Sequence, residues 1–330
     1  MSFKSISVGI LAFLGLSFFL YLWWAPESSE PQRFVAFSVE PNESFRSVTQ
    51  RLFRERLIES ESFFYYLARL TGKSGDLKAG EYDLNNQMSA WEVLRVITGS
   101  EVRLYRVTIR EGSNMFQIAR QLQRLGLVDE IQFLEAAWDP DFVAELNIPS
   151  YTVEGYLFPE TYFIPRGTSA RRIIRMLVEM FWDKLPDELF RQALEGPLSL
   201  HEVVSMASMI EKETGFSGEM PRISSVFYNR IARGMRLQSD PTAVYDLLPY
   251  GGRVTREHLF RNTPFNTYRI PRLPLTPVAN PGLLAIRASL FPETTDYLFF
   301  VSRRDGTHHF SKTYEEHRKA IDIFLRGRRQ

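Results

Sequence analysis

The sequence contains no cysteine. Disulfide bridges, thiolate metal sites and cysteine nucleophiles are therefore excluded, while the redox compartment stays open, since a cysteine-free chain suits an oxidising environment without requiring one. An excess of one charge is also missing, because 40 basic residues stand against 39 acidic ones for a formal net charge of +1. The chain therefore has no overall positive electrostatic field that would favour binding to nucleic acid, and nucleic acid is not an expected partner.

The remaining composition is that of a folded protein. Of the 330 residues, 44% are apolar and 24% are charged, which suits a globular chain of two or three domains. The 26 phenylalanines and 14 tyrosines are enough to line a groove, although aromatic rings also simply fill cores.

One long apolar run stands near the N-terminus. Residues 6–24 are nineteen positions without a charge, close to the length that crosses a hydrocarbon layer of roughly 30 Å. Lys4 precedes the run and Glu27 follows it, so the positive-inside bias predicts a cytoplasmic N-terminus, residues 1–5. A cleaved signal peptide is the competitor, but its apolar core would be shorter. We predict an uncleaved transmembrane helix over 6–25 and a linker over 26–35.

An internal repeat appears when the chain is compared with itself at an offset of seventy residues. Phe37–Pro41 aligns with Val107–Glu111, and each stretch reads as a strand and turn followed by apolar residues at helical spacing. We therefore predict an α+β fold with one small module over 36–102 and a second strand-turn-helix copy over 103–150. Modules of this size suit binding, or a rigid stalk.

The helix predicted over Ser199–Thr214 is the centre of the second half. Ser199 and Glu202 form a capping-box pattern, and the apolar residues form one stripe that ends at Glu211. A carboxyl held against apolar surface has a raised pKa, as a general acid requires, whereas a frayed last turn would leave Glu211 an ordinary surface acid. Lys212 and Glu213 are expected to face solvent.

Several polar or aromatic segments accompany this helix. The segment 151–163 is broken by Gly155 and Pro159 and could close over a sugar or pack in a core. Asp240 either caps the turn after Ser239 or faces a substrate. The segment 263–282 holds five prolines and must be irregular, as functional loops often are.

Further predicted elements are helices over 90–98, 169–184, 186–194 and 220–233, strands over 80–84, 297–302 and 308–311, and a closing helix over 314–326.

Five ordered blocks together resemble the endolytic murein transglycosylase (YceG-like) family. They are Glu154–Tyr162, Ala207–Thr214, Met235–Thr242, Asn266–Tyr268 and Asn280–Gly282. The loop over 272–278 departs from the family pattern, because it lacks both usual glycines, which affects loop shape more than the reaction.

The resemblance implies a single-pass protein of the bacterial inner membrane with its bulk in the periplasm. It implies a LysM-like module at 36–102 and a helix-rich α+β catalytic region at 103–330, with the transglycosylase core at 151–330. Its substrate would be the glycan strands of nascent peptidoglycan, cleaved internally between N-acetylmuramic acid and N-acetylglucosamine to leave a 1,6-anhydro end. Peptidoglycan synthases are candidate partners, and neither cofactor nor metal is expected.

The family's catalytic acid matches Glu211. A lytic transglycosylase can work with one carboxyl group, which protonates the glycosidic oxygen and then takes the proton of the sugar's own C6 hydroxyl. Polar residues expected to bind substrate are Gln238, Asp240, Asn266, Tyr268 and Glu160.

Three other interpretations stay open. A hydrolase would pair Glu211 with a second carboxylate, either Asp240, Glu160 or, least favoured by helical spacing, Glu213. A non-enzymatic scaffold would bind peptidoglycan through its repeats and recruit synthases. A metal hydrolase using His308 and His309 is disfavoured, because adjacent residues of a strand point to opposite faces.

Overall fold

The computed structural model describes residues 31–99, 102–247 and 251–327, together with positions 13, 15–17 and 20. The predicted transmembrane helix over 6–25 therefore lies mostly outside the described residues. Within the described part of the chain, no helix has both the length and the apolar character needed to cross a membrane.

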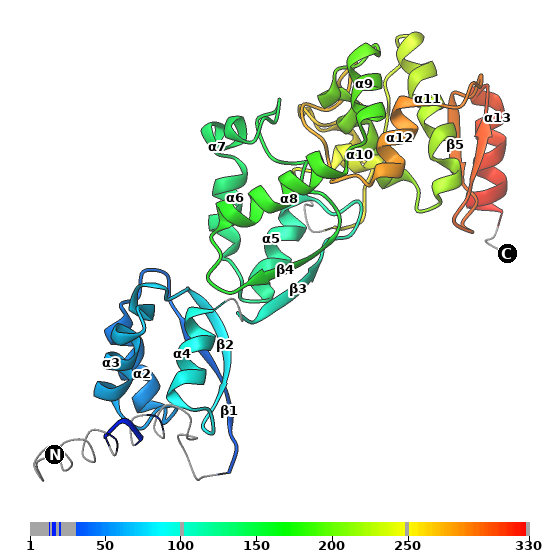
Figure 1. Cartoon of the computed structure of the whole chain (residues 1–330). Helices are drawn as coiled ribbons and strands as arrows, with labels where there is room; N and C mark the ends of the chain where they lie inside the picture. The colour runs from blue at the N-terminus through cyan, green and yellow to red at the C-terminus, as the bar shows by residue number, and fades with distance from the viewer. Residues whose placement is uncertain are drawn as a thin grey trace, which may run out of the picture. The chain divides into compact units, whose positions relative to one another are not determined.

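The chain divides into two compact units. The first consists of Met1–Arg106 and Phe163–Thr168, and the second of Val107–Tyr162 and Ser169–Gln330. The described helices and small two-stranded sheets give the mixed α+β fold that the sequence predicted. In chain order (Figure 1) the first elements are β1 (Phe34–Val39), α2 (Phe45–Arg54), α3 (Glu61–Leu70), β2 (Gly80–Asn85), α4 (Ala90–Thr98) and β3 (Leu104–Thr108). They are followed by α5 (Met115–Arg124), α6 (Glu130–Ala137), α7 (Pro140–Glu145), β4 (Thr161–Pro165), α8 (Ala170–Lys184), α9 (Asp187–Glu195), α10 (Leu200–Glu213), α11 (Met220–Ala232), α12 (Leu283–Leu290), β5 (Phe299–Ser302), β6 (His308–Ser311), α13 (Tyr314–Ile321) and the π-helical turn η5 (Asp322–Arg326).

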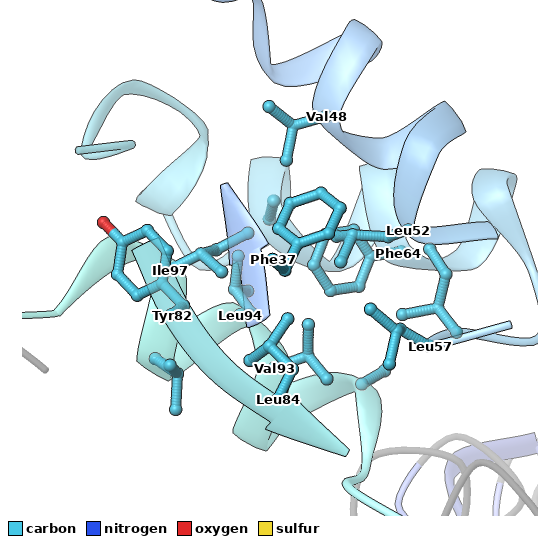
Figure 2. Close-up of a cluster of buried hydrophobic side chains, with 14 of the residues drawn as sticks. Phe37, Val48, Leu52, Leu57, Phe64, Tyr82, Leu84, Val93, Leu94 and Ile97 are labelled. Atoms are coloured by element: carbon cyan, nitrogen blue, oxygen red, sulfur yellow. The ribbon is translucent and has the colours of Figure 1, made fainter. Parts of the chain in front are cut away.

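The first unit has its own hydrophobic core. Strands β1 and β2 pair antiparallel with Phe37 opposite Tyr82, and α2, α3 and α4 supply most of the other apolar side chains. Figure 2 shows Leu52, Phe64 and Leu94 meeting in this cluster, where each is fully buried. Burial of side chains of this size is the main stabilising contribution available to a module without disulfides.

A buried acid joins the two stretches of chain that build the first unit. Glu81 is 3% exposed, and its carboxylate accepts hydrogen bonds from Arg103 Nη1 (2.9 Å), Tyr105 Oη (2.9 Å) and Arg166 Nη1 (2.7 Å). Arg166 belongs to the short returning stretch Phe163–Thr168. The unit is therefore assembled from discontinuous segments, which residue spacing alone does not reveal.

The seventy-residue repeat is also present in the backbone. The turn residues Asn42 (φ 63°) and Gly112 (φ 72°) are both left-handed, as are Arg56 (φ 57°) and Gly126 (φ 65°) one helix later. The N-caps of α2 and α5, Ser44 and Asn114, likewise stand seventy apart. Positive φ disfavours side chains with a Cβ, so its recurrence at matched positions indicates one local fold used twice.

Helix α10 is the central helix of the second unit. It packs against α9, α11 and α12, which surround it in Figure 1. The capping box of Ser199 and Glu202 forms as predicted. Helix α11 and strands β5 and β6 begin and end within about two residues of the predicted bounds, but α12 was not predicted, and the closing helix predicted over 314–326 is α13 followed by the π-helical turn η5. Every residue of α10 from Val203 to Ile210 is buried, so the helix is covered on more sides than a single apolar stripe implies.

Candidate active site

Glu213, at the last position of α10, lies against a loop rather than in solvent. Ser239, which is 1% exposed, donates its hydroxyl to Glu213 Oε1 at 2.5 Å. Burial raises the pKa of Glu213 to about 7, and the charge of Asp240 adds to this, while the Ser239 hydrogen bond and Arg230 oppose it. The expectation that Glu213 faces solvent is wrong, because the segment around Ser239 covers this side of the helix.

A pocket of about 560 Å³ opens beside Glu213. The segment after α11 contributes Gln238 and Asp240, and the irregular proline-rich segment contributes Tyr268. The opposite lining comes from the hairpin β5–β6 and α13, with Phe299, Phe300, Val301, Ser302, Gly306, His308, Tyr314 and His317. Carboxyl, amide and aromatic groups thus face one space, the combination that suits a polar ring-shaped ligand.

Three of the predicted substrate residues meet at this pocket. Tyr268 donates its hydroxyl to Asp240 Oδ1 at 2.7 Å, which fixes both side chains. Gln238 is exposed and has a left-handed backbone (φ 52°), a sparsely populated conformation that occurs often at functional sites. Its backbone nitrogen donates to Thr267 O at 3.2 Å, so the neighbouring loop holds this turn.

The other two predicted substrate residues do not line the pocket. Asn266 is fully buried, donates Nδ2 to Arg261 O (2.6 Å) and accepts from Tyr268 N (3.0 Å), so it shapes the loop that carries Tyr268. Glu160 is exposed, and its carboxylate accepts from the adjacent Thr161 N at 2.9 Å, just before β4.

Glu211 is half-buried but is not part of the pocket lining. Its Oε2 accepts the backbone nitrogen of Gly282 at 3.0 Å, at the N-cap of α12, where a carboxylate is favourable. Burial raises the pKa of Glu211, as predicted, and nearby Glu111 raises it further, whereas the Gly282 hydrogen bond and Lys212 lower it. Gln238, Asp240 and Tyr268 thus line the same pocket as Glu213, and Glu211 is not among the lining residues.

A buried polar network links two of the motif blocks, Glu154–Tyr162 and Asn280–Gly282. Asn280 is fully buried and its Oδ1 accepts the backbone nitrogens of Gly155 (2.8 Å) and Leu157 (2.9 Å). Its Nδ2 donates to Ser113 O (2.9 Å) and Glu154 Oε1 (2.8 Å). The whole amide is thereby satisfied, as a buried polar group requires.

Glu154 is the acid of this network and is fully buried. It accepts hydrogen bonds from Met115 N at the start of α5 and from Tyr245 Oη at 2.7 Å. Burial raises the pKa of Glu154 to about 7, although these hydrogen bonds oppose the shift. The sequence analysis did not predict that Glu154 is a buried network residue, because only tertiary packing shows that the segment carrying Glu154 is enclosed.

The loop over 272–278 runs along α10 despite its missing glycines. Val278 N donates to Ser208 Oγ at 3.0 Å, and Pro277 packs over Gly155 so closely that a Cβ on Gly155 would lie 2.5 Å from Pro277 Cγ. Gly155 also has a φ of 91°, so both space and backbone require glycine at this position.

No group of three or more histidines and carboxylates able to hold a metal ion occurs within residues 31–99, 102–247 and 251–327. His308 instead pairs with Glu219, and His309 packs on Phe324 with ring centroids 5.6 Å apart.

A largely buried carboxyl at the end of a buried helix, beside a polar and aromatic pocket, is an arrangement that enzymes use for acid–base catalysis. The chain belongs to the YceG-like family, whose model matches residues 37–323. A relative in Bacillus subtilis, named endolytic murein transglycosylase, is 30% identical over 92% of this chain and 89% of its own length.

Further similarities agree with this assignment. A Streptococcus pneumoniae protein of the same name is 27% identical over 96% of this chain, which spans 65% of that longer protein. The crystal structure of a YceG-like protein from Listeria monocytogenes is 30% identical, with a TM-score of 0.61 over 87% of this chain and 98% of that one.

Proposed function

We propose that this protein is an endolytic peptidoglycan lytic transglycosylase that limits the length of glycan strands. The observation that carries the proposal is the position of Glu213, a carboxyl of raised pKa, at the pocket that Gln238, Asp240 and Tyr268 also line. The relatives named endolytic murein transglycosylase support the same reaction class. The bond cleaved is the β-1,4 linkage from N-acetylmuramic acid to N-acetylglucosamine.

The reaction needs no water. Glu213 donates its proton to the glycosidic oxygen, the bond from the anomeric carbon to this oxygen breaks, and N-acetylglucosamine leaves with a free 4-hydroxyl. The Glu213 carboxylate then takes the proton of the C6 hydroxyl of N-acetylmuramic acid, whose oxygen bonds to the anomeric carbon and closes the 1,6-anhydro ring. Because the nucleophile is tethered to the sugar, the entropic cost of capturing a separate molecule is avoided.

Geometry favours Glu213 over Glu211 for this role. Each carboxylate accepts one hydrogen bond, Glu211 from Gly282 N and Glu213 from Ser239 Oγ, and the difference between them is that Glu213 lines the pocket. We assign Glu211 to holding the start of α12, and its prediction as the catalytic acid becomes the alternative that the substitutions in the Discussion test.

The chemical identity of the product tests the reaction. We expect mass analysis of purified glycan strands treated with the wild type to show fragments ending in 1,6-anhydro-N-acetylmuramic acid, one water lighter than hydrolysis products. Reducing ends would contradict the proposal and favour a hydrolase, with Asp240 at the same pocket as the second carboxylate. Heat-denatured protein is the control for spontaneous cleavage.

We further propose that residues 6–25 anchor the protein in the bacterial inner membrane, with residues 1–5 cytoplasmic and the region after the 26–35 linker in the periplasm. The uncharged run and the aromatic residues at its end support this. In the same proposal, 36–102 is a LysM-like module that holds glycan, 103–150 is its second copy, 151–330 is the catalytic core, and peptidoglycan synthases are partners.

Membrane association is testable by fractionation. We expect the full-length chain to sediment with membranes and to resist extraction by carbonate or high salt, since a spanning helix is held by apolar contacts. A chain beginning at residue 31 should become soluble, and protease added to spheroplasts should digest the exposed bulk of the full-length protein. Recovery of the full-length chain in the soluble fraction would refute the anchor.

A further inference from the structure

His308 lies at the start of β6, on the side of the pocket formed by the hairpin β5–β6. Its side chain is 10% exposed, and the edge of the Phe300 ring meets it with ring centroids 5.5 Å apart. Burial on these sides restricts the ring to one orientation, so its nitrogens occupy defined positions.

Glu219 fixes this histidine by three contacts. The backbone nitrogen of His308 donates to both Glu219 carboxylate oxygens at 3.1 Å, and His308 Nδ1 lies 2.9 Å from Glu219 Oε2. The Glu219 side chain is itself 9% exposed. An ionised carboxylate only accepts hydrogen bonds, so Nδ1 carries the proton, and in the neutral ring Nε2 is then an acceptor.

We propose that His308, oriented by Glu219, is a second substrate-contacting group of this pocket. Its Nε2 accepts a hydrogen bond from a hydroxyl of the sugar bound beside Glu213. The inference rests on the proposed function for its substrate class, a glycan of amino sugars. Glu219 touches no substrate in this scheme and acts as a positioning residue, because it selects the tautomer.

The neighbouring histidine provides a matched control. His309 stands opposite Val301 in the hairpin, packs on Phe324 and is not part of the pocket lining. Substitutions at 308 and 309 therefore remove the same side chain from adjacent positions of one strand, and only the first faces the pocket.

Kinetics and histidine NMR on the full-length protein in detergent test the proposal. We expect His308→Ala to lower kcat/KM about tenfold, the effect of one lost hydrogen bond, while His309→Ala stays within about twofold of the wild type. Glu219→Leu, which removes the acceptor for Nδ1–H, should resemble His308→Ala, whereas Glu219→Gln keeps an amide oxygen that can accept Nδ1–H and should stay near the wild type.

The NMR arm needs no turnover. The chain has five histidines, so ¹⁵N-labelled ring nitrogens are few enough to assign by substitution. In Glu213→Gln protein, a soluble tetrasaccharide of alternating N-acetylglucosamine and N-acetylmuramic acid should shift His308 Nε2 saturably and leave His309 unchanged.

Two results would overturn the proposal: cleavage by His308→Ala within twofold of the wild type, or a His308 ring unaffected by the tetrasaccharide. Failure of the proposed function can be distinguished from failure of the His308 proposal, since the wild type itself would then release no anhydro product. In that case the His308 shift still decides whether this histidine contacts the glycan.

Discussion

Replacing Glu213 by glutamine is expected to reduce glycan cleavage by roughly 10²- to 10⁴-fold, the usual contribution of a general acid. Glutamine keeps the size of the side chain and can still accept the Ser239 hydroxyl, so fold and glycan binding should persist. The measurement is the rate of anhydro-product release, with the melting temperature and a glycan-binding assay run in parallel. Loss of cleavage with retained binding would also exclude a purely scaffolding role.

Glu211→Gln is the matched control, two residues earlier on the same helix. Its amide oxygen can still accept Gly282 N, so we expect activity within a few-fold of the wild type. The opposite pattern, with Glu211→Gln inactive and Glu213→Gln active, would refute our assignment and restore the one made from family resemblance.

The pH profile gives an independent check on Glu213. Its pKa is raised to about 7, so the acid holds its proton at lower pH and loses it as the pH rises through about 7. We expect kcat/KM to fall over that interval. Because the charge of Asp240 contributes to the shift, Asp240→Asn should move this fall to lower pH. A fall that Asp240→Asn leaves in place would argue against Glu213 as the titrating group.

The second large effect concerns stability. Asn280→Ala is expected to lower the free energy of unfolding by about 3 to 5 kcal/mol, because it leaves several buried groups without partners. These groups include Gly155 N, Leu157 N and the Glu154 carboxyl. The corresponding fall in melting temperature is roughly 10 °C for a unit of this size.

Asn280→Asp separates the two halves of this amide. It keeps the acceptor for Gly155 and Leu157 but places a second carboxyl against Glu154, whose pKa is already about 7. We expect this variant to be closer to the wild type at low pH, where the pair shares protons, and to lose stability as the pH rises. Urea unfolding at several pH values measures this, and an Asn280→Ala change below about 1 kcal/mol would contradict the network's importance.

Local signals made most helices predictable. The N-caps Ser199 and Ser169 act through hydrogen bonds to residues three positions later, so the sequence itself contains what determines where α10 and α8 begin. The repeat was visible for the same reason, since its turns and caps are local features.

The site was harder to predict because it depends on distant segments. Helical spacing places Glu211 in the apolar stripe, and only the contact between Ser239 and Glu213, which no local pattern predicts, shows that a second acid of α10 lies at the pocket. The pairing of His308 with Glu219 was not predicted for the same reason, since the two residues stand 89 positions apart. Glu213 stands two residues after Glu211 in the same motif block, and this proximity was the sequence signal that could have raised Glu213 as an alternative acid.

The returning stretch Phe163–Thr168 has a practical consequence for dissecting this protein. A recombinant fragment ending near residue 106 would contain Glu81 and Arg103 but not Arg166, so it would lack one of the cations that neutralise a buried carboxylate. A fragment beginning at residue 107 would in turn carry six residues that belong to the missing unit. Separating the two units as independent polypeptides therefore requires a circularly permuted or grafted design in which residues 163–168 are supplied to the first unit and replaced by a linker in the second.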